Sequence, residues 1–458
     1  MVFTGAFGEP VLTKRYGVPD SHTLAVASEY GAYDVLRQVV GKREPKSLID
    51  EVKASNLRGR GGAGFPMGLK WGFVNPQPGQ EVYLVVNADE GEPGTFKDRT
   101  LMENDPHRIV EGCILAAYAL GAKRGYIYVR CELALAIERL EHAIAEAYQA
   151  GLLGQRVAGT DYAFDLHVHL GAGAYICGEE TALLNSLEGY RGEPRLKPPF
   201  PAVSGLFGMP TVVNNLESMA HIPDILERGG AAWSALSRLE QDGGVRLYGV
   251  SGHVRRPGIY EGPVGLTLNE VIYELGGGLL HPERELKAVI PGGSSTPVLR
   301  PGDLVDAPDE KHPLHRWHGK SHLDVCMGVD TAKALGTMLG TCCAVVMDSS
   351  VSMVDAGRNL MRFYKHESCG QCTPCREGTG WLVDVLDRLC DGEASEKEVD
   401  LLVEIAGNMM GNTICALADG TAMPLLGMIR KFSDDFYAAA HKRPRTQLHD
   451  SWAQTFTR

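Results

Sequence analysis

The stretch Glu81-Val-Tyr-Leu-Val-Val-Asn87 decides the fold class of this 458-residue chain. It is short, apolar and rich in β-branched residues, which predicts a strand that is buried on both faces. Gly125–Arg130 and Asp165–Leu170 have the same character, and helical patterns at Pro106–Leu120 and Leu133–Ala150 alternate with the strands. This alternation predicts an α/β fold with a Rossmann-like parallel sheet that is covered by helices.

The loops that follow these strands are candidate binding segments, because ligands of parallel sheets bind beyond the carboxyl ends of the strands. Asn87–Glu92 and Gly171–Glu180 are both acidic and contain glycine. Their carboxylates could hold a metal ion, act as general acid and base, accept hydrogen bonds from ribose hydroxyls, or form a solvated surface. Ribose acceptors would repel a 2′-phosphate and would therefore favour NAD over NADP. The amides of Asn214 and Asn215 are suited to the carbonyl edge of a flavin.

A glycine-rich loop, Arg58–Pro66, matches G-x-G-x-x-G at Gly59, Gly61 and Gly64. A predicted helix, Pro45–Leu57, precedes it, whereas a strand precedes the Rossmann fingerprint, so the loop is not that fingerprint. Its four glycines still describe backbone that can approach a phosphate or a flat ring closely, with cations nearby at Arg58, Arg60 and Lys70. The alternative is a flexible linker.

Three cysteines at Cys-x-x-Cys spacing, Cys369, Cys372 and Cys375, mark a second candidate site. With a fourth, distant cysteine this spacing is typical of a [4Fe–4S] cluster. Cys415 is the best candidate for that ligand, and a structural zinc site or plain thiols are the alternatives. Helices are expected at Ser352–Lys365, Glu377–Leu389, Glu396–Met410 and Ala422–Ala440. Together they predict a four-helix bundle that, if it is up-and-down, brings the two cysteine segments to one end.

Composition excludes several classes of protein. The net charge of −12 argues against nonspecific nucleic-acid binding. No apolar run reaches the roughly 18 residues of a membrane span, and the first ten residues lack the features of a signal peptide. Eleven cysteines, an odd number, indicate reduced thiols and a metal site. We expect a cytosolic protein that reaches a membrane only through a partner.

The predicted organisation has five parts. They are an N-terminal segment with the glycine-rich loop (1–75), a Rossmann-like domain for nucleotide binding (76–241), a small β-grasp module (242–325), a helical bundle with the iron–sulfur cluster (326–440) and a polar tail (441–458).

The motifs together resemble one known family. The Gly-rich loop, Asn-Ala-Asp-Glu-Gly-Glu-Pro-Gly-Thr at 87–95, Tyr-Ile-Cys-Gly-Glu-Glu-Thr at 175–181 and the cysteine run are similar to the NADH-binding flavoprotein subunit of respiratory complex I. The resemblance covers nearly the whole chain. It implies FMN, NADH and one [4Fe–4S] cluster, with hydride transfer from NADH to FMN and single-electron transfer to the cluster, so that no side chain need act as acid or base.

The resemblance also implies the ligand residues. The cluster would use Cys369, Cys372, Cys375 and Cys415. FMN would contact Gly59, Gly61, Lys70, Asn87, Asp89, Glu90, Tyr175, Gly178, Glu179, Glu180, Val213, Asn214 and Asn215. NADH would lie against Gly62, Phe65, Phe73, Glu92, Glu180, Lys197 and Phe200, and Gly64 completes the loop.

The implied partners are the other hydrophilic-arm subunits of complex I, especially a thioredoxin-like [2Fe–2S] subunit and a larger iron–sulfur subunit. The implied location is the cytoplasmic face of a bacterial membrane. Two alternatives share the motifs in whole or in part: a diaphorase subunit of an NAD-linked hydrogenase or formate dehydrogenase, and a noncatalytic iron–sulfur relay that keeps the fold.

Overall fold

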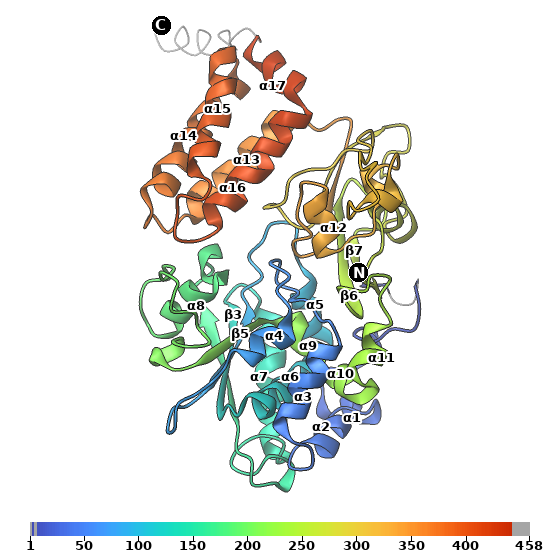
Figure 1. Cartoon of the computed structure of the whole chain (residues 1–458), viewed down its shortest axis with the longest axis vertical. Helices are drawn as coiled ribbons and strands as arrows, with labels where there is room; N and C mark the ends of the chain where they lie inside the picture. The colour runs from blue at the N-terminus through green and yellow to red at the C-terminus, as the bar shows by residue number, and fades with distance from the viewer. Residues whose placement is uncertain (1, 4–6, 442–458) are drawn as a thin grey trace, which may run out of the picture.

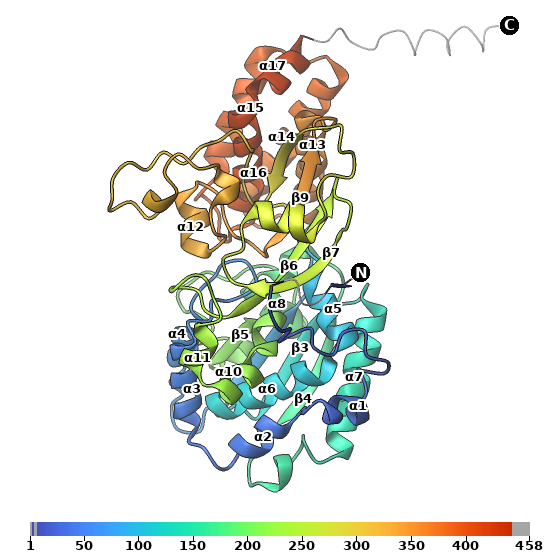
Figure 2. The same cartoon turned by 90° about the vertical axis from the view of Figure 1, so that its right-hand side faces the viewer.

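A computed structural model describes residues 2–3 and 7–441 of the chain. Three regions follow one another along its long axis: an α/β region, a second β-rich region, and a bundle of helices (Figures 1 and 2). Within the described part of the chain, no helix is both long and apolar enough to cross a membrane. Most of the tail predicted at 441–458 lies outside the described residues.

The α/β region is built on a four-stranded sheet in the order β4-β3-β2-β5, in which every pair of neighbours is parallel. The strands are β2 (Tyr83–Ala88), β3 (Arg124–Arg130), β4 (Asp165–Gly171) and β5 (Thr211–Asn215). The connecting helices include α5 (Lys97–Asn104), α6 (Pro106–Leu120), α7 (Ala134–Gln149) and α8 (Glu180–Leu187). The predicted parallel sheet is therefore confirmed.

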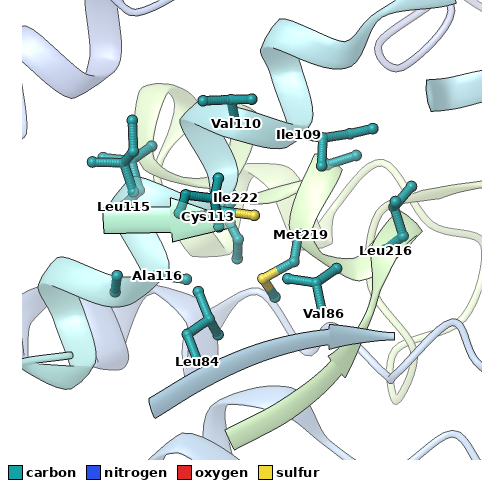
Figure 3. Packing of buried hydrophobic residues seen from close by; sticks show 14 of the residues in the cluster. Leu84, Val86, Ile109, Val110, Cys113, Leu115, Ala116, Leu216, Met219 and Ile222 are labelled. Atoms are coloured by element: carbon teal, nitrogen blue, oxygen red, sulfur yellow. The ribbon is translucent and has the colours of Figure 1, made fainter. Parts of the chain in front are cut away.

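Helix α6 forms the centre of the core of this region (Figure 3). The Asp105 side chain accepts from Arg108 N at its start, and Gly121 ends it in the left-handed conformation. Helix α9 (Leu216–Ala220) approaches so closely that a Cβ added at Gly112 would lie 2.2 Å from Met219 O. Only glycine permits this contact.

The N-terminal segment wraps the α/β region. Its helices are α1 (Leu24–Glu29), α2 (Asp34–Val39), α3 (Pro45–Ala54) and α4 (Met67–Gly72). Their buried side chains share one core with β2 and α6. Helix α3 ends three residues before the predicted Leu57. Helices α10 (Ile222–Arg228) and α11 (Gly230–Ser234) cover the same side.

A second, five-stranded sheet has the order β1-β7-β6-β9-β8. Its strands are β1 (Val2–Phe3), β6 (Val245–Gly252), β7 (Gly258–Pro263), β8 (Leu286–Ile290) and β9 (Cys343–Asp348). The short helix η4 (Glu270–Leu275) packs beside it, as expected for a β-grasp module. The predicted boundary at 325/326 is wrong for this sheet, because β9 pairs with both β6 and β8. Helix α12 (Val329–Ala334) also precedes that strand.

The last region is a helical bundle. It contains α13 (Met353–Glu367), α14 (Thr373–Asp391), α15 (Glu396–Met409), α16 (Leu417–Lys431) and α17 (Ser433–Ala440). The prediction of a single last helix over Ala422–Ala440 is wrong: the backbone leaves the helical conformation at Phe432, which separates α16 from α17. Short 3-10 turns complete the structure at Val157–Gly159, Tyr175–Gly178 (η2), Leu206–Gly208, His315–Trp317 and His322–Asp324.

Candidate functional site

The two acidic strand-end loops meet at the carboxyl end of the parallel sheet. Asn87, near the end of β2, donates from Nδ2 to the carbonyl of Gly178 at 2.7 Å. Gly178 ends η2, which leads directly into α8. The two candidate binding loops therefore lie together.

Asp89, in the first of these loops, is buried, with 2% of its surface exposed. Its Oδ1 has no hydrogen-bond partner among the described residues. A Cβ added at Gly178 would lie 3.3 Å from Asp89 Oδ2, and one at Gly91 would lie 3.4 Å from it. Burial raises the pKa of Asp89 to about 7. Asp89 thus has an unpaired acceptor oxygen next to two glycines that carry no side chain. This arrangement suits a ligand with hydroxyl groups, such as a nucleotide.

Glu90 and Glu92 flank this position, but their carboxylates are already engaged. Glu90 accepts from the backbone N–H groups of Asp98 at 2.6 Å and Arg99 at 2.8 Å, at the N-terminus of α5. Glu92 accepts from the Tyr175 hydroxyl at 2.7 Å and from Ser295 N at 2.7 Å. These hydrogen bonds hold both glutamate side chains in fixed positions in the loop before any ligand binds.

A network of four charged residues lies at the start of α8. Lys70 Nζ lies 2.9 Å from Glu180 Oε2, and Lys197 Nζ lies 2.9 Å from Glu179 Oε1 and 3.2 Å from Glu180 Oε1. The other carboxylate oxygen of Glu179 caps α8 by accepting from Thr181 N. Burial opposes ionisation of Glu180, but the two lysines outweigh it and lower the pKa of that carboxyl. The network thus brings two lysines and two glutamates together at the start of α8.

The glycine-rich loop lies against β5. Gly59 N donates to Phe65 O at 2.9 Å, which closes the loop, and a Cβ added at Gly61 would lie 3.0 Å from the Asn215 Cβ. Gly62 bridges to Gly340, and a Cβ added at Gly64 would clash with Val329. The loop thus exposes backbone toward the strand ends.

The two arginines of this loop do not serve as free cations. The Arg60 side chain is fully buried, and its Nη1 lies 2.7 Å from Asp242 Oδ1. Arg58 pairs with Asp330 at 2.8 Å. Both arginines, which the sequence places as cations near this loop, thus tie the loop to later parts of the chain. Lys70 remains.

Three of the predicted binding residues have exposed phenyl rings. Phe65 is 47% exposed, and Phe73 and Phe200 are each 58% exposed. The ring centroids of Phe65 and Phe73 are 6.1 Å apart, with 47° between the ring planes. Exposed aromatic faces at this separation offer a stacking surface to a flat ring.

The paired asparagines of β5 are differently placed. Val213 is buried, and Asn214 Oδ1 accepts from Trp71 Nε1 at 3.2 Å. The Asn215 amide is turned inward: its Oδ1 accepts from Glu217 N at 3.1 Å, and its Nδ2 donates to Asp98 at 2.7 Å. The expectation that both amides face a flavin edge is thus weakened for Asn215, whose side chain caps α9.

Sequence reasoning missed Lys97, a fully buried cation next to Asn215 at the end of β5. Its Nζ lies 2.8 Å from both Asp98 Oδ1 and Glu217 Oε2, and 3.4 Å from Asn215 Oδ1. Despite burial, the two carboxylates raise its pKa. The only sequence signal was the Lys-Asp pair that closely follows the acidic loop. This buried charge fixes the orientation of Asn215.

The four cysteines of the second site gather at one end of the bundle. Cys369 and Cys372 precede α14, Cys375 lies in its first turn, and Cys415 lies in the connection between α15 and α16. Ile414 N lies 3.4 Å from Cys372 Sγ, which brings the two segments together. Burial raises the pKa of Cys415 to about 11, with smaller contributions from Glu179, Cys375 and Cys369.

No three His, Cys, Asp or Glu side chains in the described ranges converge tightly enough to hold one metal ion. Four thiols at one end of a bundle suit a cluster, in which each thiolate binds a different iron atom and the sulfurs stay further apart. The donor set of these four cysteines fits an iron–sulfur cluster.

The two sites are neighbours. Arg191, in the loop after α8, donates from Nη2 to the carbonyl of Cys369 at 2.9 Å. Cys177 and Ile176 of η2 belong to one apolar cluster with Cys375, and the other three cysteines of the second site pack against that cluster. The fold and site together define an oxidoreductase with a nucleotide-binding region next to an iron–sulfur region.

Comparison with known proteins agrees with this class. Residues 52–224 match the model of the Nuo51 FMN-binding domain, residues 247–299 match the SLBB domain, and residues 355–439 match the NADH-ubiquinone oxidoreductase-F iron-sulfur binding region. The matches follow the three structural regions described above.

Similar proteins cover almost the whole chain. An F-type NADH-quinone oxidoreductase protein of Rhizobium meliloti (strain 1021) is 48% identical over 95% of this chain and 98% of its own length. The mitochondrial NADH dehydrogenase [ubiquinone] flavoprotein 1 of Dictyostelium discoideum is 47% identical, over 92% and 84%. A crystal structure of NAD+-reducing [NiFe]-hydrogenase in the H2-reduced state has a TM-score of 0.80 at 32% identity, covering 98% of this chain and 70% of that one.

The chain belongs to the NADH-quinone oxidoreductase-F family, whose members are flavoprotein subunits with an FMN-binding domain and a [4Fe–4S] region. The predicted family, its enzyme class and its cofactors are thereby confirmed.

Proposed function

We propose that this chain oxidises NADH at the carboxyl end of the parallel sheet and delivers the electrons to the cysteine site of the bundle. The observation that carries the proposal is the contact between the sites: Arg191, in the loop after α8, donates to the carbonyl of Cys369, and Glu179 and Glu180 lie at the start of that same helix. FMN, when bound, supplies the chemistry that accepts a hydride and releases electrons singly. The chain supplies binding, orientation and charge.

The proposed flavin site includes Asp89. Its unpaired, buried Oδ1 offers an acceptor for a hydroxyl of the ligand. The bare backbone of Gly61 and Gly178 permits close approach, and Lys70 offers a cation to a phosphate or to a ring that gains negative charge. The remaining contacts follow the motif match: Gly59, Asn87, Glu90, Tyr175, Glu179, Val213, Asn214 and Asn215.

The residues proposed for NADH lie further out. Phe65 and Phe73 would hold the adenine ring between or against their exposed faces, with Phe200 at the edge. Glu180 would accept from a ribose hydroxyl and disfavour a 2′-phosphate by charge repulsion. Gly62, Gly64, Glu92 and Lys197 complete this set. No side chain need exchange a proton during hydride transfer.

Family membership places the chain in a complex, and the particular partner subunits and the location are part of this proposal. As a member of the NADH-quinone oxidoreductase-F family, the chain functions together with other proteins of its complex. We propose that these are a thioredoxin-like [2Fe–2S] subunit and a larger iron–sulfur subunit, in a peripheral arm at the cytoplasmic face of the membrane. Identification of the proteins that copurify with the chain tests this assembly.

A second function is favoured by one observation. One similar solved structure is of an NAD+-reducing [NiFe]-hydrogenase, which favours a role for this chain as the NAD-reactive subunit of such a hydrogenase. Copurification of a hydrogenase subunit in place of quinone-reductase subunits would select this alternative.

The direct test is anaerobic titration of the reconstituted chain with NADH. We expect the flavin absorbance to bleach with NADH and to respond much less to NADPH at equal concentration. A chain that binds flavin but keeps its absorbance unchanged with NADH would contradict the proposed function.

A further inference from the structure

Five side chains link all three regions of the structure between the two proposed cofactor sites. They form what is here called the clasp: Glu92, Tyr175, Ser294, Tyr364 and Glu367. Glu92 follows β2, Tyr175 begins η2, Ser294 follows β8 of the second sheet, and the last two belong to α13 of the bundle.

Tyr175 is the first link of the clasp. Its hydroxyl donates to Glu92 Oε2 at 2.7 Å, and its backbone N–H donates to Glu367 Oε2 at 2.8 Å. Both acceptors are carboxylates, which make stronger hydrogen bonds than neutral acceptors. One residue of the nucleotide region is thus held on one side by a strand-end loop and on the other by the final residue of α13.

Ser294 is the second link. Its hydroxyl lies 3.3 Å from Glu92 Oε1 and 2.6 Å from the hydroxyl of Tyr364. Ser294 is 2% exposed and Tyr364 is fully buried, so bulk water does not compete for this contact. The backbone N–H of Ser295 also donates to Glu92 Oε1, at 2.7 Å.

Aromatic packing fills the space around these hydrogen bonds. The Tyr175 ring meets the rings of Phe363 and Tyr364 edge-on, with centroids 5.2 Å and 6.0 Å away. The end of α13 is therefore packed as well as hydrogen-bonded to η2. Cys369 follows Glu367 by only two residues, so the position of the first cysteine depends on where α13 ends.

We propose that Ser294, Tyr364 and Glu367 are positioning residues for electron transfer, because the clasp sets the separation of the cysteine segment from the strand-end loops. This inference rests on the proposed function. Electron transfer slows steeply as the separation of donor and acceptor grows, whereas hydride transfer takes place wholly on the nucleotide side of the clasp. Loosening the clasp therefore slows electron transfer to the cysteine site and leaves hydride transfer unchanged.

The test uses the full chain with the substitutions Tyr364→Phe and Ser294→Ala. Each of them removes one of the two buried hydroxyls and so breaks the hydrogen bond between them. The matched control is Tyr437→Phe, which removes a hydroxyl that donates to Asp400 elsewhere on the bundle. Amide hydrogen exchange is measured over residues 366–376 in the flavin-free and loaded chain. Stopped-flow absorbance follows flavin bleaching by NADH, and rapid-freeze electron paramagnetic resonance follows reduction of the cluster.

The expected result is faster exchange over 366–376 and a severalfold slower appearance of the cluster signal in both variants, with the rate of flavin bleaching and the iron content equal to those of the parent. The control should match the parent throughout. Cluster reduction at the parental rate in both variants overturns the inference, whatever the exchange shows. If NADH fails to bleach the flavin of the parent, the proposed function fails, and exchange in the flavin-free chain then decides on the clasp alone.

Discussion

Lys70 and Glu180 form an ion pair, with Nζ 2.9 Å from Oε2, across 110 residues of sequence. The pair joins the helix after the glycine-rich loop to the first residue of α8. Lys197 reaches the other oxygen of the same carboxylate at 3.2 Å. Two cations therefore hold Glu180 in its charged form, and one of them, Lys70, lies on α4, which Phe65 and Phe73 flank in the sequence.

Neutralising Glu180 should change the preference between the two nicotinamide cofactors. Glu180→Gln keeps the size of the side chain and removes the charge that repels a 2′-phosphate. We expect the ratio of kcat/KM for NADPH to that for NADH to rise by about tenfold, or about 1.4 kcal/mol. Steady-state assays with both cofactors measure it. Glu396→Gln, on the distant α15, is the control, and an unaltered ratio in Glu180→Gln would exclude this carboxylate as the discriminating group.

Removing one predicted cluster ligand should separate iron from flavin. Cys372→Ala should abolish the iron–sulfur absorbance and reduce the iron content, while flavin binding persists because Cys372 lies outside the strand-end loops. Cys131→Ser is the matched control, since this thiol is exposed and lies at the end of β3. Equal iron content in Cys372→Ala and the parent would reject the ligand role.

The close approach of α6 and α9 should make Gly112 intolerant of any side chain. Gly112→Ala places Cβ 2.2 Å from Met219 O, and we expect a loss of about 1–3 kcal/mol in the free energy of unfolding. Gly407→Ala on α15 meets nothing within 4 Å and should raise that free energy by about 0.5–1 kcal/mol, because alanine favours helix. Thermal unfolding of both variants checks the opposite signs; a stable Gly112→Ala would contradict the packing of α6.

Glu111 should make stability depend on pH. Burial raises its pKa to about 7 from the ordinary 4.5, although it accepts from Tyr33 N and Leu36 N. Between these two values the folded state keeps a proton that the unfolded state has released, so this group reduces stability as pH rises through the window, by up to about 3 kcal/mol. Urea unfolding at pH 5 and pH 8 measures it.

The comparison variant for that experiment is Glu111→Gln, which cannot ionise. Its unfolding free energy should fall less than that of the parent between pH 5 and pH 8. Identical changes in both proteins would show that Glu111 has no raised pKa.

Much of the fold could be predicted from local pattern. The β-branched run at 81–87 became β2 because such a run has no polar face to expose, and Pro106–Leu120 became α6 with the predicted bounds because Asp105 and Gly121 supply both caps. Strand β9 could not be assigned to its sheet in this way. It pairs with β6, which lies about a hundred residues earlier, and a pairing over that distance cannot be predicted from the local sequence pattern.

The sequence by itself determined the chemistry of this protein: glycines that allow close approach, carboxylates that follow parallel strands, and three closely spaced cysteines that suit a cluster. These depend on residue type and short spacing, which a linear chain states directly. Only the tertiary structure decided which charges are free. It buried Arg60 against Asp242, turned Asn215 toward Asp98 and left Asp89 Oδ1 without a partner among the described residues. The physical reason is that a side chain's partners come from distant segments, and burial makes each such pairing strong.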